Sequence, residues 1–534
     1  MASKCLPLFA LLLSAVSAYK IVVFAPDISN SQLIWNARVA EKLADAGHDV
    51  TMIRMKYFNV NKTDVSIDQS KMKVWMFYMA KPSQNYEEMQ QQHSKMIYQD
   101  APIWSSASRK SITTMTTFLC DACENLLMQK ELLKMITDAK FDLAFSHMYD
   151  YCPIGLIHYA KIPSWIWLNS GQLMDNVARH IGVPIPTSYV PPMMSDARDD
   201  MTFVQRVKSL VGYTAMSVIY PKIVIWPETE VFRKHIDPTF PYLGDLADQC
   251  PLVMVNTDEL YDIPKPTLHK IVNIGGLGMK FENAKPLSGE FKELVEKANN
   301  VILFSLGSVA NPTHMPYEWK KALMSSFARF PQYQFIVRYD GNDIDDICPK
   351  NVYLSKWIPQ RDLLQHPKTR AFITHGGYNS LQETINAAKP VILIPLFGDQ
   401  HRNARLAEKH GFGIYFPKKE ITEQNMYDAI VEISQERYTA AVKRMHDMVE
   451  KKPIQPEEQF LKWTEFLAEF KDLPNLVPHG TKLGFVQYHN LDVLAVIGIV
   501  VLVVVTILYK IMKAIVRLGR WILKKATTAK AKQQ

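Results

Sequence analysis

The chain of 534 residues is too long for a single hydrophobic core and suits two domains. Its formal net charge is +8, and the Lys and Arg residues that follow Tyr509 account for all of it, so the rest of the chain is formally neutral. This distribution argues against nucleic-acid binding, and the lack of internal repeats in the sequence argues against a solenoid.

The N-terminus predicts entry into the secretory pathway. Residues 1–18 combine Lys4, an apolar run from Leu6 to Val16 and the small pair Ser17-Ala18, which is typical of a cleaved signal peptide. Asn61, in Asn-Lys-Thr, is a glycosylation sequon that is usable only if the body of the protein is lumenal.

Removal of the signal leaves an odd number of cysteines, so at least one of them is unpaired or pairs between chains. Cys120 and Cys123 have the spacing of a redox motif, but they lie in a helical stretch without a preceding strand. We interpret them as core residues or as part of an incidental disulfide. The cysteines and histidines do not show the spacing of zinc ligands.

A first domain is predicted over residues 19–265. Short apolar strands alternate with helices there, which indicates a doubly wound parallel sheet. The first helix is predicted from Leu33 to Ala46, with Gly47 as its stop. The strands are predicted at Lys20 to Phe24, Asp49 to Arg54, Leu143 to Phe145, Ser164 to Trp167 and Leu252 to Asn256. Residues 266–286, which include several glycines, are interpreted as a linker.

A second domain of the same kind, with helices that return at its end, is predicted over residues 287–485. Its strands are predicted at Val301 to Ser305, Gln334 to Arg338, Ala371 to Thr374 and Val391 to Ile394. Ligands of such sheets bind at the carboxyl ends of the strands. We therefore expect an α/β protein with two doubly wound Rossmann-like domains facing a cleft.

The C-terminus predicts a membrane anchor. Residues 491–509 are almost wholly apolar and span roughly 28 Å as a helix, which is enough to cross a bilayer core. Residues 510–534 are basic and contain no acid, as expected for a cytosolic tail on anionic lipid. The predicted topology is a lumenal body, one transmembrane helix and a short cytosolic tail.

The strongest functional signal lies between Trp357 and Gln400. A turn of His375-Gly376-Gly377 follows a predicted strand, and its glycines let the backbone approach a ligand closely. The helix that Asn379 and Ser380 open presents unpaired N–H groups, which suit a diphosphate. A tryptophan that stacks on a base and acids that accept from ribose and sugar hydroxyls complete a site for a nucleotide sugar. The residues predicted to bind this donor are Ser308, Trp357, Gln360, His375, Gly377, Asn379, Ser380, Glu383, Asp399 and Gln400.

This segment resembles the donor-site signature of UDP-glycosyltransferases, and most closely that of the animal UDP-glucuronosyltransferases. The resemblance covers nearly the whole chain and implies the GT-B fold. It also implies a UDP-glucuronate or UDP-glucose donor, a small lipophilic acceptor, inversion at the anomeric carbon, and no metal or other cofactor. In this interpretation the product is a soluble conjugate, and the role is detoxification.

The donor sugar itself is left open. His401, Arg402 or Arg405 would supply a partner for the carboxylate of glucuronate, whereas glucose would also satisfy Asp399 and Gln400. The spacing of Asp343 and Asp345 matches a metal-binding motif of GT-A enzymes, but these acids lie in a turn rich in Gly, Asn and Asp, and we interpret it as solvated.

The last five residues, from Lys530 through Lys532 to Gln534, resemble the signal that returns type I membrane proteins to the endoplasmic reticulum. We therefore expect a single-pass type I protein of the endoplasmic reticulum membrane, with its body in the lumen. We expect the chain to associate with the membrane and with a second chain, as a homo- or hetero-dimer. We do not expect it to bind nucleic acid.

The two catalytic positions of the resembled family are substituted. Counting from Gly47-His48 places the general base on Gln32, and counting from Phe141-Asp142 places the acid that supports it on His147. Glutamine has no usable basic site near neutral pH.

Three interpretations remain open at this point. His147 is itself the base and is held by Gln32, or the acceptors need little help from a base, as amines and ionised acids do. In the third interpretation the chain is a catalytically impaired UDP-sugar-binding partner that modulates an active relative.

Overall fold

The computed structural model describes residues 18–57, 67–79, 91–92, 94–99, 105–279 and 286–531. Almost all of the predicted signal peptide, Asn61 and the end of the predicted retrieval signal lie outside the described residues. The chain divides into two compact units, of which the first ends at Leu476 and the second begins at Val477.

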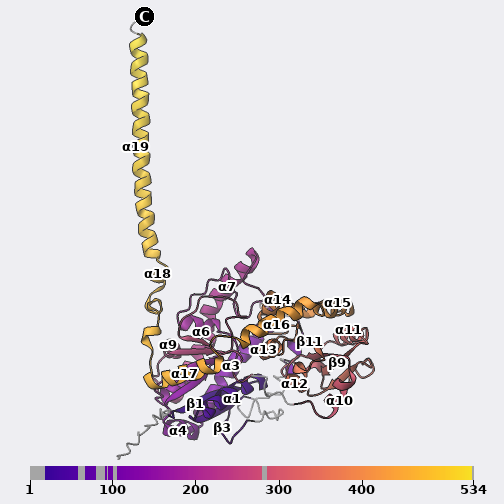
Figure 1. The fold of residues 1–534 in the computed structure, drawn as a ribbon. Coiled ribbons are helices and arrows are strands. Elements are labelled where there is room, and N and C mark those ends of the chain that lie inside the picture. Colours follow the sequence, from indigo (N-terminus) through magenta and orange to yellow (C-terminus); the bar gives the residue numbers. More distant parts are fainter. Residues whose placement is uncertain are drawn as a thin grey trace, which may run out of the picture. The chain divides into compact units, whose positions relative to one another are not determined.

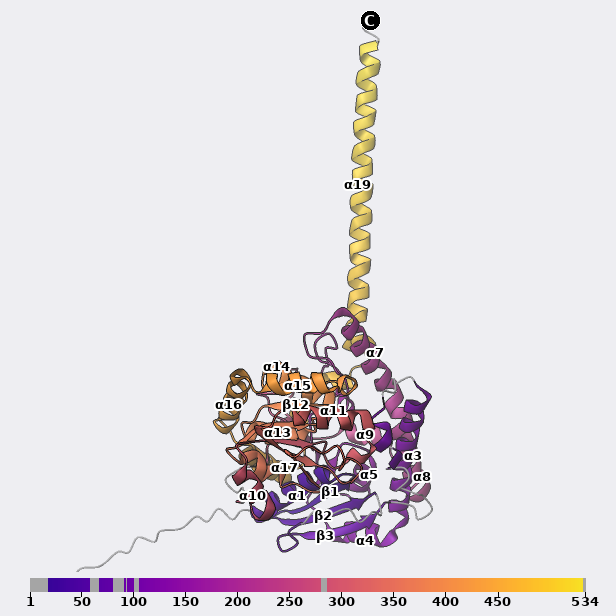
Figure 2. The ribbon, with the colours of Figure 1, turned by 90° about the vertical axis from the view of Figure 1, so that its right-hand side faces the viewer.

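The first unit contains two parallel sheets, each flanked by helices (Figure 1). The first sheet has the strand order β3-β2-β1-β4-β5-β6-β7. Its strands are β1 (Lys20–Asp27), β2 (Asp49–Lys56), β3 (Lys73–Tyr78), β4 (Leu143–His147), β5 (Trp165–Asn169), β6 (Leu252–Val255) and β7 (Ile271–Asn273). The helices of this half are α1 (Asn30–Asp45), α3 (Ser106–Met128), α4 (Lys130–Ala139), α5 (Cys152–Tyr159), α6 (Asp175–His180), α7 (Phe203–Tyr220), α8 (Trp226–His235) and α9 (Leu243–Asp248). Figure 2 shows β1, β2 and β3 side by side.

The second sheet has the strand order β10-β9-β8-β11-β12-β13. Its strands are β8 (Asn300–Ser305), β9 (Tyr333–Arg338), β10 (Val352–Ser355), β11 (Thr369–Thr374), β12 (Val391–Leu393) and β13 (Gly413–Tyr415). The helices of this half are α10 (Gly289–Lys297), α11 (Tyr317–Ala328), α12 (Gln360–Gln365), α13 (Tyr378–Asn386), α14 (Gln400–Lys409), α15 (Glu423–Ile433) and α16 (Glu436–Glu450). The prediction of two doubly wound Rossmann-like domains is therefore confirmed.

Both sheets are buried on both faces, and the alternation of side chains along each strand explains how. In β1, Val22 and Phe24 pack into one core, while Ile21 and Val23 pack into the core on the opposite face. Continuous apolar runs such as these produce the strands that the sequence predicts, because every side chain of such a strand has a core to enter.

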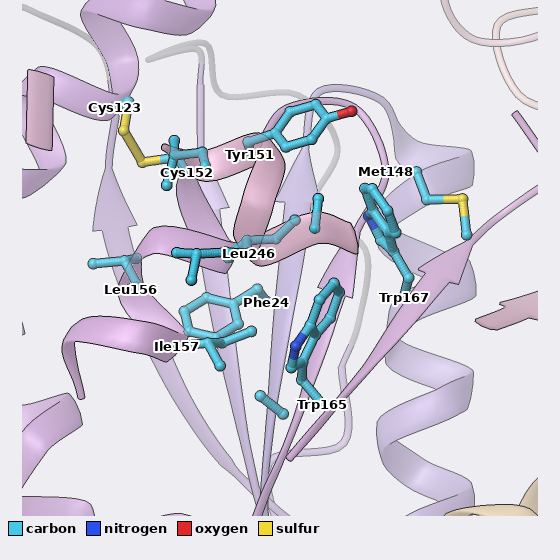
Figure 3. Close-up of a cluster of buried hydrophobic side chains, with 14 of the residues drawn as sticks. Phe24, Cys123, Met148, Tyr151, Cys152, Leu156, Ile157, Trp165, Trp167 and Leu246 are labelled. Carbon is cyan, nitrogen blue, oxygen red and sulfur yellow. A yellow bond between two sulfur atoms is a disulfide. The ribbon is translucent and has the colours of Figure 1, made fainter. Parts of the chain in front are cut away.

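One of these cores lies between the first sheet and α5, α8 and α9. Figure 3 shows Phe24 of β1 and Trp165 and Trp167 of β5 among the side chains of α5 and α9. A disulfide between Cys123 of α3 and Cys152 at the start of α5 lies at the edge of this core, and their Cα atoms are 5.7 Å apart. The partner of Cys123 is therefore not Cys120, its neighbour in the sequence motif.

The segment predicted as a linker contributes a strand. Within residues 266–286, β7 pairs in parallel with β6 and forms an edge of the first sheet. Val272 and Ile274 are buried in the core of the first domain. The segment is too short for its periodicity to be recognised in the sequence, and its burial shows only in the assembled sheet.

The chain also returns from the second half to the first. Helix α17 (Pro456–Phe470) buries Phe460 and Leu467 in the same core as Ile21 and Val23 of β1. Its sequence lies inside the range predicted for the second domain, which anticipated return helices but not the sheet on which they pack.

The second unit contains α18 (Phe485–Tyr488) and the long helix α19 (Leu491–Ala531) (Figure 1). Residues 491–528 are long and apolar enough to cross a membrane, as predicted for residues 491–509. The basic tail continues the same helix to Ala531 without a break.

A second helical stretch among the described residues, Phe203–His235, also has the length and composition of a membrane span. Its C-terminal part belongs to the body instead, because Val224, Ile225 and Phe232 are buried in the core of the first domain. Its N-terminal part, α7, leaves apolar side chains such as Phe203 and Val211 exposed.

Candidate active site

The predicted donor residues gather at the carboxyl edge of the second sheet. Ser308 follows β8, the His375-Gly376-Gly377 turn connects β11 to α13, and Asp399 and Gln400 follow β12 and begin α14. These three strands are neighbours in the sheet, so their carboxyl ends meet at one edge. The structure thus brings together residues as far apart in the sequence as Ser308 and Gln400.

His375 sits between two glycines that have room for no larger residue. A Cβ atom on Gly307 would lie 2.5 Å from His375 Cε1, and one on Gly377 would lie 2.8 Å from His375 Nε2. Gly307 also has a φ of +77°, a conformation that favours glycine. Burial, with a smaller effect of Arg338, lowers the pKa of His375 to about 4, so its imidazole is neutral at physiological pH.

Arg338 is a site residue that the sequence analysis missed. It ends β9, its side chain donates to the carbonyl oxygens of Gly307 and Lys356, and its guanidinium lies 5.4 Å from the centre of the Trp357 ring. A positive charge is thereby held beside His375 and the loop after β8. A basic residue at the carboxyl end of a predicted strand was the signal available in the sequence.

Glu383 and Gln360 form a direct pair. Gln360 Nε2 of α12 donates to Glu383 Oε2 of α13 over 2.7 Å. Burial raises the pKa of Glu383, and Gln360, Arg38 and Arg361 oppose that shift. Trp357, which precedes α12, is 57% exposed as a residue, so it is accessible for stacking.

Asp399 and Gln400 differ in the hydrogen bonds that their side chains make within the protein. Gln400 is buried, and its side-chain oxygen accepts from the backbone N–H groups of Leu396 and Phe397 over 2.8 and 3.1 Å, so it shapes its own loop. Asp399 accepts from Asn403 Nδ2 over 3.0 Å, and burial raises the pKa of its carboxyl. A Cβ atom on Gly171 of the first domain would lie 3.9 Å from Asp399 Oδ2, so Asp399 is close to the loop after β5.

The start of α13 joins the two domains. Asn379 Nδ2 donates to the carbonyl oxygen of Ser31 over 3.4 Å, and Asn256 Nδ2 donates to Asn379 Oδ1 over 3.4 Å. One residue earlier, the hydroxyl of Tyr378 donates to Thr257 over 2.8 Å. Helix α13 is therefore positioned by the first domain as well as by its own sheet. Ser380 follows in the first turn of α13.

Gln32 lies in the first turn of α1, which begins at Asn30 and not at Leu33 as predicted. The backbone carbonyl of Gln32 accepts from Asn36. Its side-chain oxygen is buried and has no hydrogen-bond partner among the described residues.

His147, the last residue of β4, is almost completely buried, with 1% of its surface exposed. Its Nδ1 accepts from the backbone N–H of Tyr149 over 3.3 Å, and its Nε2 lies 3.9 Å from Asp150 Oδ2. Burial lowers its pKa, while Asp150 opposes that shift. The lone pair of the neutral ring thus already has a partner, which leaves the ring poorly placed to accept a proton from an acceptor.

The side chain from this loop that meets Gln32 is Tyr149, which the sequence analysis missed. Burial raises the pKa of Tyr149 to about 12, nearby Asp399 adds to that rise, and hydrogen bonds from Ser170 and Gln32 oppose it. The Tyr149 and Ser170 hydroxyls are 2.8 Å apart. Tyr149 therefore connects the predicted base position with the predicted sugar-binding acid.

Buried acids hold the loop that carries Tyr149. Asp150 accepts from the hydroxyl of Tyr57 over 2.9 Å and from the backbone N–H of Cys152 over 3.1 Å. Glu228 of α8 accepts from the backbone N–H of Tyr151 over 2.8 Å. Burial, and to a smaller extent the neighbouring Asp150, raise the pKa of Glu228 well above its ordinary value.

The cations considered for a glucuronate carboxylate are engaged elsewhere. Arg402 donates to Gln172 Oε1 over 3.1 Å and to Asp262 Oδ1 over 2.8 Å, and Arg405 donates to the carbonyl oxygen of Asp196 over 2.9 Å. Both arginines therefore tie α14 to the first domain, and Arg402 also ties it to the segment after β6. His401 Nδ1 lies 3.0 Å from the hydroxyl of Tyr415.

The acids with GT-A spacing are also accounted for in part. Asp343 pairs with Lys320 over 2.5 Å and accepts from the hydroxyl of Tyr339 over 2.7 Å. This supports a structural role for Asp343 in its turn.

Comparison with known proteins agrees with this geometry. The family model described as UDP-glucoronosyl and UDP-glucosyl transferase matches residues 19–528. The Caenorhabditis elegans protein named "Putative UDP-glucuronosyltransferase ugt-48" is 32% identical over 91% of this chain and 93% of its own length. UDP-glucuronosyltransferase 1A8 of Rattus norvegicus is 32% identical over 73% of this chain and 72% of its own.

Solved structures show the same fold at low sequence identity. The glycotransferase of kitacinnamycin superposes with a TM-score of 0.56 at 16% identity, over 86% of this chain and 100% of its own. CalG4, the calicheamicin glycosyltransferase, superposes with a TM-score of 0.55 at 15% identity, over 84% of this chain and 98% of its own.

Proposed function

Because the chain belongs to the UDP-glucuronosyl and UDP-glucosyl transferase family, we propose that it transfers glucuronate or glucose from a UDP-sugar to a small lipophilic acceptor, with inversion at the anomeric carbon. The observation that carries the proposal is the carboxyl edge of the second sheet. There His375, the pair of Glu383 and Gln360, and the exposed ring of Trp357 lie on adjoining loops around the start of α13.

Each part of a UDP-sugar has a chemically suitable partner at this edge. The exposed Trp357 ring offers a stacking surface for uracil, and Glu383 accepts from ribose hydroxyls. Arg338 and the N-terminus of α13 provide positive potential for the diphosphate beside Ser308 and neutral His375. Asp399 is placed to accept from hydroxyls of the sugar.

The acceptor side follows from the loop after β4. Gln32 lacks a basic site, and the nitrogen of His147 that holds the lone pair already accepts from the Tyr149 N–H. These features favour the interpretation in which the acceptor needs little base help. Amines, carboxylates and acidic phenols are then better nucleophiles than aliphatic alcohols.

The location we propose is the endoplasmic reticulum membrane, with a lumenal body and one transmembrane helix at α19. The apolar length of α19, the basic end of the chain and the Cys123–Cys152 disulfide support it, because disulfides persist in oxidising compartments. Conjugation of lipophilic compounds at a membrane suits detoxification.

The test is detection of product by mass spectrometry. The purified full-length protein is offered a mixed panel of amines, carboxylic acids, phenols and alcohols, with UDP-glucuronate and UDP-glucose supplied in separate reactions. We expect one UDP-sugar to give conjugates, with amines or acids among the acceptors. A protein that binds UDP-sugar but forms no conjugate with any acceptor would contradict the proposal and support a non-catalytic partner.

A further inference from the structure

Arg38 of α1 has a buried nitrogen that is not satisfied by the protein. Its Nη1 is buried and has no hydrogen-bond partner among the described residues. Its aliphatic stem lies against the loop after β7, where a Cβ atom on Gly278 would be 3.4 Å from Arg38 Cδ. A buried guanidinium N–H without a partner costs free energy, and such an atom is commonly satisfied by a ligand or a bound water.

The position of Arg38 follows from the way α1 and α13 meet. Ser31 contacts Asn379 at the start of α13, and Arg38 lies seven residues further along α1, on the same face two turns later. Glu383 lies four residues after Asn379, on the same face of α13. Arg38 and Glu383 therefore both lie within about two helical turns of the hydrogen bond that joins α1 to α13.

The charges of the two residues respond to one another. Burial lowers the pKa of Arg38, and the Glu383 carboxylate opposes that shift. Burial raises the pKa of Glu383, and Arg38 is among the groups that oppose it. Even so, Glu383 does not satisfy Arg38 Nη1, while Gln360 occupies one of the Glu383 oxygens. The two groups are thus close enough to interact and still have hydrogen-bonding capacity to spare.

We propose that Arg38 is a donor-binding residue contributed by the first domain, and that its guanidinium donates to a ribose hydroxyl of the UDP-sugar while Glu383 accepts from the ribose. A hydroxyl is one donor and two acceptors, so it satisfies an arginine N–H and a carboxylate oxygen together. The assignment rests on the proposed donor site, in which Glu383 is the ribose acceptor.

Two consequences follow from this contact. The ribose is held from both domains, so the protein discriminates ribonucleotides from nucleotides that lack the ribose hydroxyls. Arg38 and Gln32 belong to the same helix, so donor binding at Arg38 also sets the position of Gln32 relative to the reacting sugar.

The experiment compares UDP with 2′,3′-dideoxy-UDP on the full-length protein by isothermal titration. The variant Arg38→Met keeps the aliphatic stem that packs near Gly278 and removes every N–H donor. Lys42→Met, one turn further along α1, is the matched control. We expect Arg38→Met to weaken UDP about tenfold or more and to leave the affinity for dideoxy-UDP nearly unchanged, while Lys42→Met binds both as the wild type does.

The outcomes distinguish an error in the role of Arg38 from an error in the proposed donor site. A wild type that binds UDP, combined with an Arg38→Met variant of equal UDP affinity, overturns the role of Arg38 alone. Equal losses for UDP and dideoxy-UDP overturn the ribose contact, since they indicate an effect through the diphosphate or through folding. A wild type that binds no UDP overturns the donor site and the role of Arg38 together.

Discussion

At the scale of single residues, the proposed donor site depends on pairs that lie far apart in sequence. Glu383 and Gln360 are 23 residues apart and share a hydrogen bond, and His375 fits only because Gly307 and Gly377 lack side chains. Such contacts commit each side chain to one geometry before the donor arrives. That preorganisation reduces the entropy cost of binding.

Removing the Glu383 carboxylate or the His375 imidazole should therefore weaken nucleotide binding. A hydrogen bond to a charged group contributes about 1.5–3 kcal/mol, so we expect Glu383→Ala to lower UDP affinity at least tenfold, and His375→Ala to do the same if the diphosphate lies beside it. Isothermal titration with UDP measures both, and Glu436→Ala on the exposed side of α16 is the control. Unchanged UDP affinity in both variants would remove the site assignment.

On the proposed acceptor side, the loop after β4 supplies the residue that faces Gln32. Tyr149 interacts with Gln32 and Ser170, whereas His147 is almost completely buried. We expect Tyr149→Phe to lower the turnover number several-fold to about tenfold while UDP affinity stays the same, because one net hydrogen bond is worth about 1 kcal/mol. Ser170→Ala should give a smaller loss in the same initial-rate assay.

The pH dependence of the initial rate tests whether His147 is the general base. Burial lowers the pKa of His147, so its ring is neutral above about pH 6.5, the ordinary value for histidine. If His147 were the base, the rate would fall as pH drops below that value, and His147→Ala would slow a phenol acceptor about 10²–10⁴-fold. We expect instead only a small effect of His147→Ala on initial rates with a phenol between pH 6 and 8. A loss of the larger size would restore the interpretation in which His147 is the base.

At the scale of elements, the segment from β4 to α5 is held on several sides. Asp150 and Glu228 anchor its backbone, and the Cys123–Cys152 disulfide ties the start of α5 to α3. These restraints meet within three residues of Tyr149. Because its backbone is held in this way, the segment can position Tyr149 against the second domain.

Loss of the disulfide should therefore affect stability and turnover together. It closes a loop with a sequence separation of 29, for which the chain-entropy estimate is about 3–4 kcal/mol. We expect Cys152→Ser to lower the melting temperature and the rate of sugar transfer, whereas Cys348→Ser, remote from this segment, should change neither. A Cys152→Ser protein with wild-type melting temperature and rate would show that the bond does not support the loop.

At the scale of the whole molecule, the first unit is held together across its two sheets. Arg402 joins α14 to Gln172 and Asp262, and α17 returns from the second half to cover the first sheet. The second unit adds α19, whose apolar and basic parts form one helix. Because the apolar helix α19 belongs to the second unit, the membrane topology can be tested independently of sugar transfer.

In sealed microsomes we expect Asn61 to carry glycan and the C-terminal end to be open to protease. Replacing Lys530 and Lys532 by Ser should let the protein leave the endoplasmic reticulum, which an endoglycosidase assay would detect as processed glycan. Ser substitutions at Lys524 and Lys525, upstream of the retrieval signal, are the matched control. A protected tail, or an Asn61 that stays unmodified, would contradict the single-span model.

The sequence by itself determined the two Rossmann-like domains, the apolar C-terminal helix and the edge of the sheet where the donor residues gather. Those features depend on local patterns, because an apolar strand followed by a glycine turn and a helix places its loop at the carboxyl edge wherever the sheet forms. Motif residues such as His375 and Asp399 could for that reason be placed at one edge of the sheet without coordinates.

Only the tertiary structure decided which side chains meet. It placed Tyr149 rather than His147 beside Gln32, paired Cys123 with Cys152, formed β7 within the predicted linker and placed Arg38 where the charge of Glu383 influences its pKa. Arg38 and Glu383 are separated by more than 300 residues, and no local periodicity predicts that the charge of one influences the pKa of the other. The tertiary fold, in which the start of α13 donates a hydrogen bond to the Ser31 carbonyl of α1, brings these two helices together.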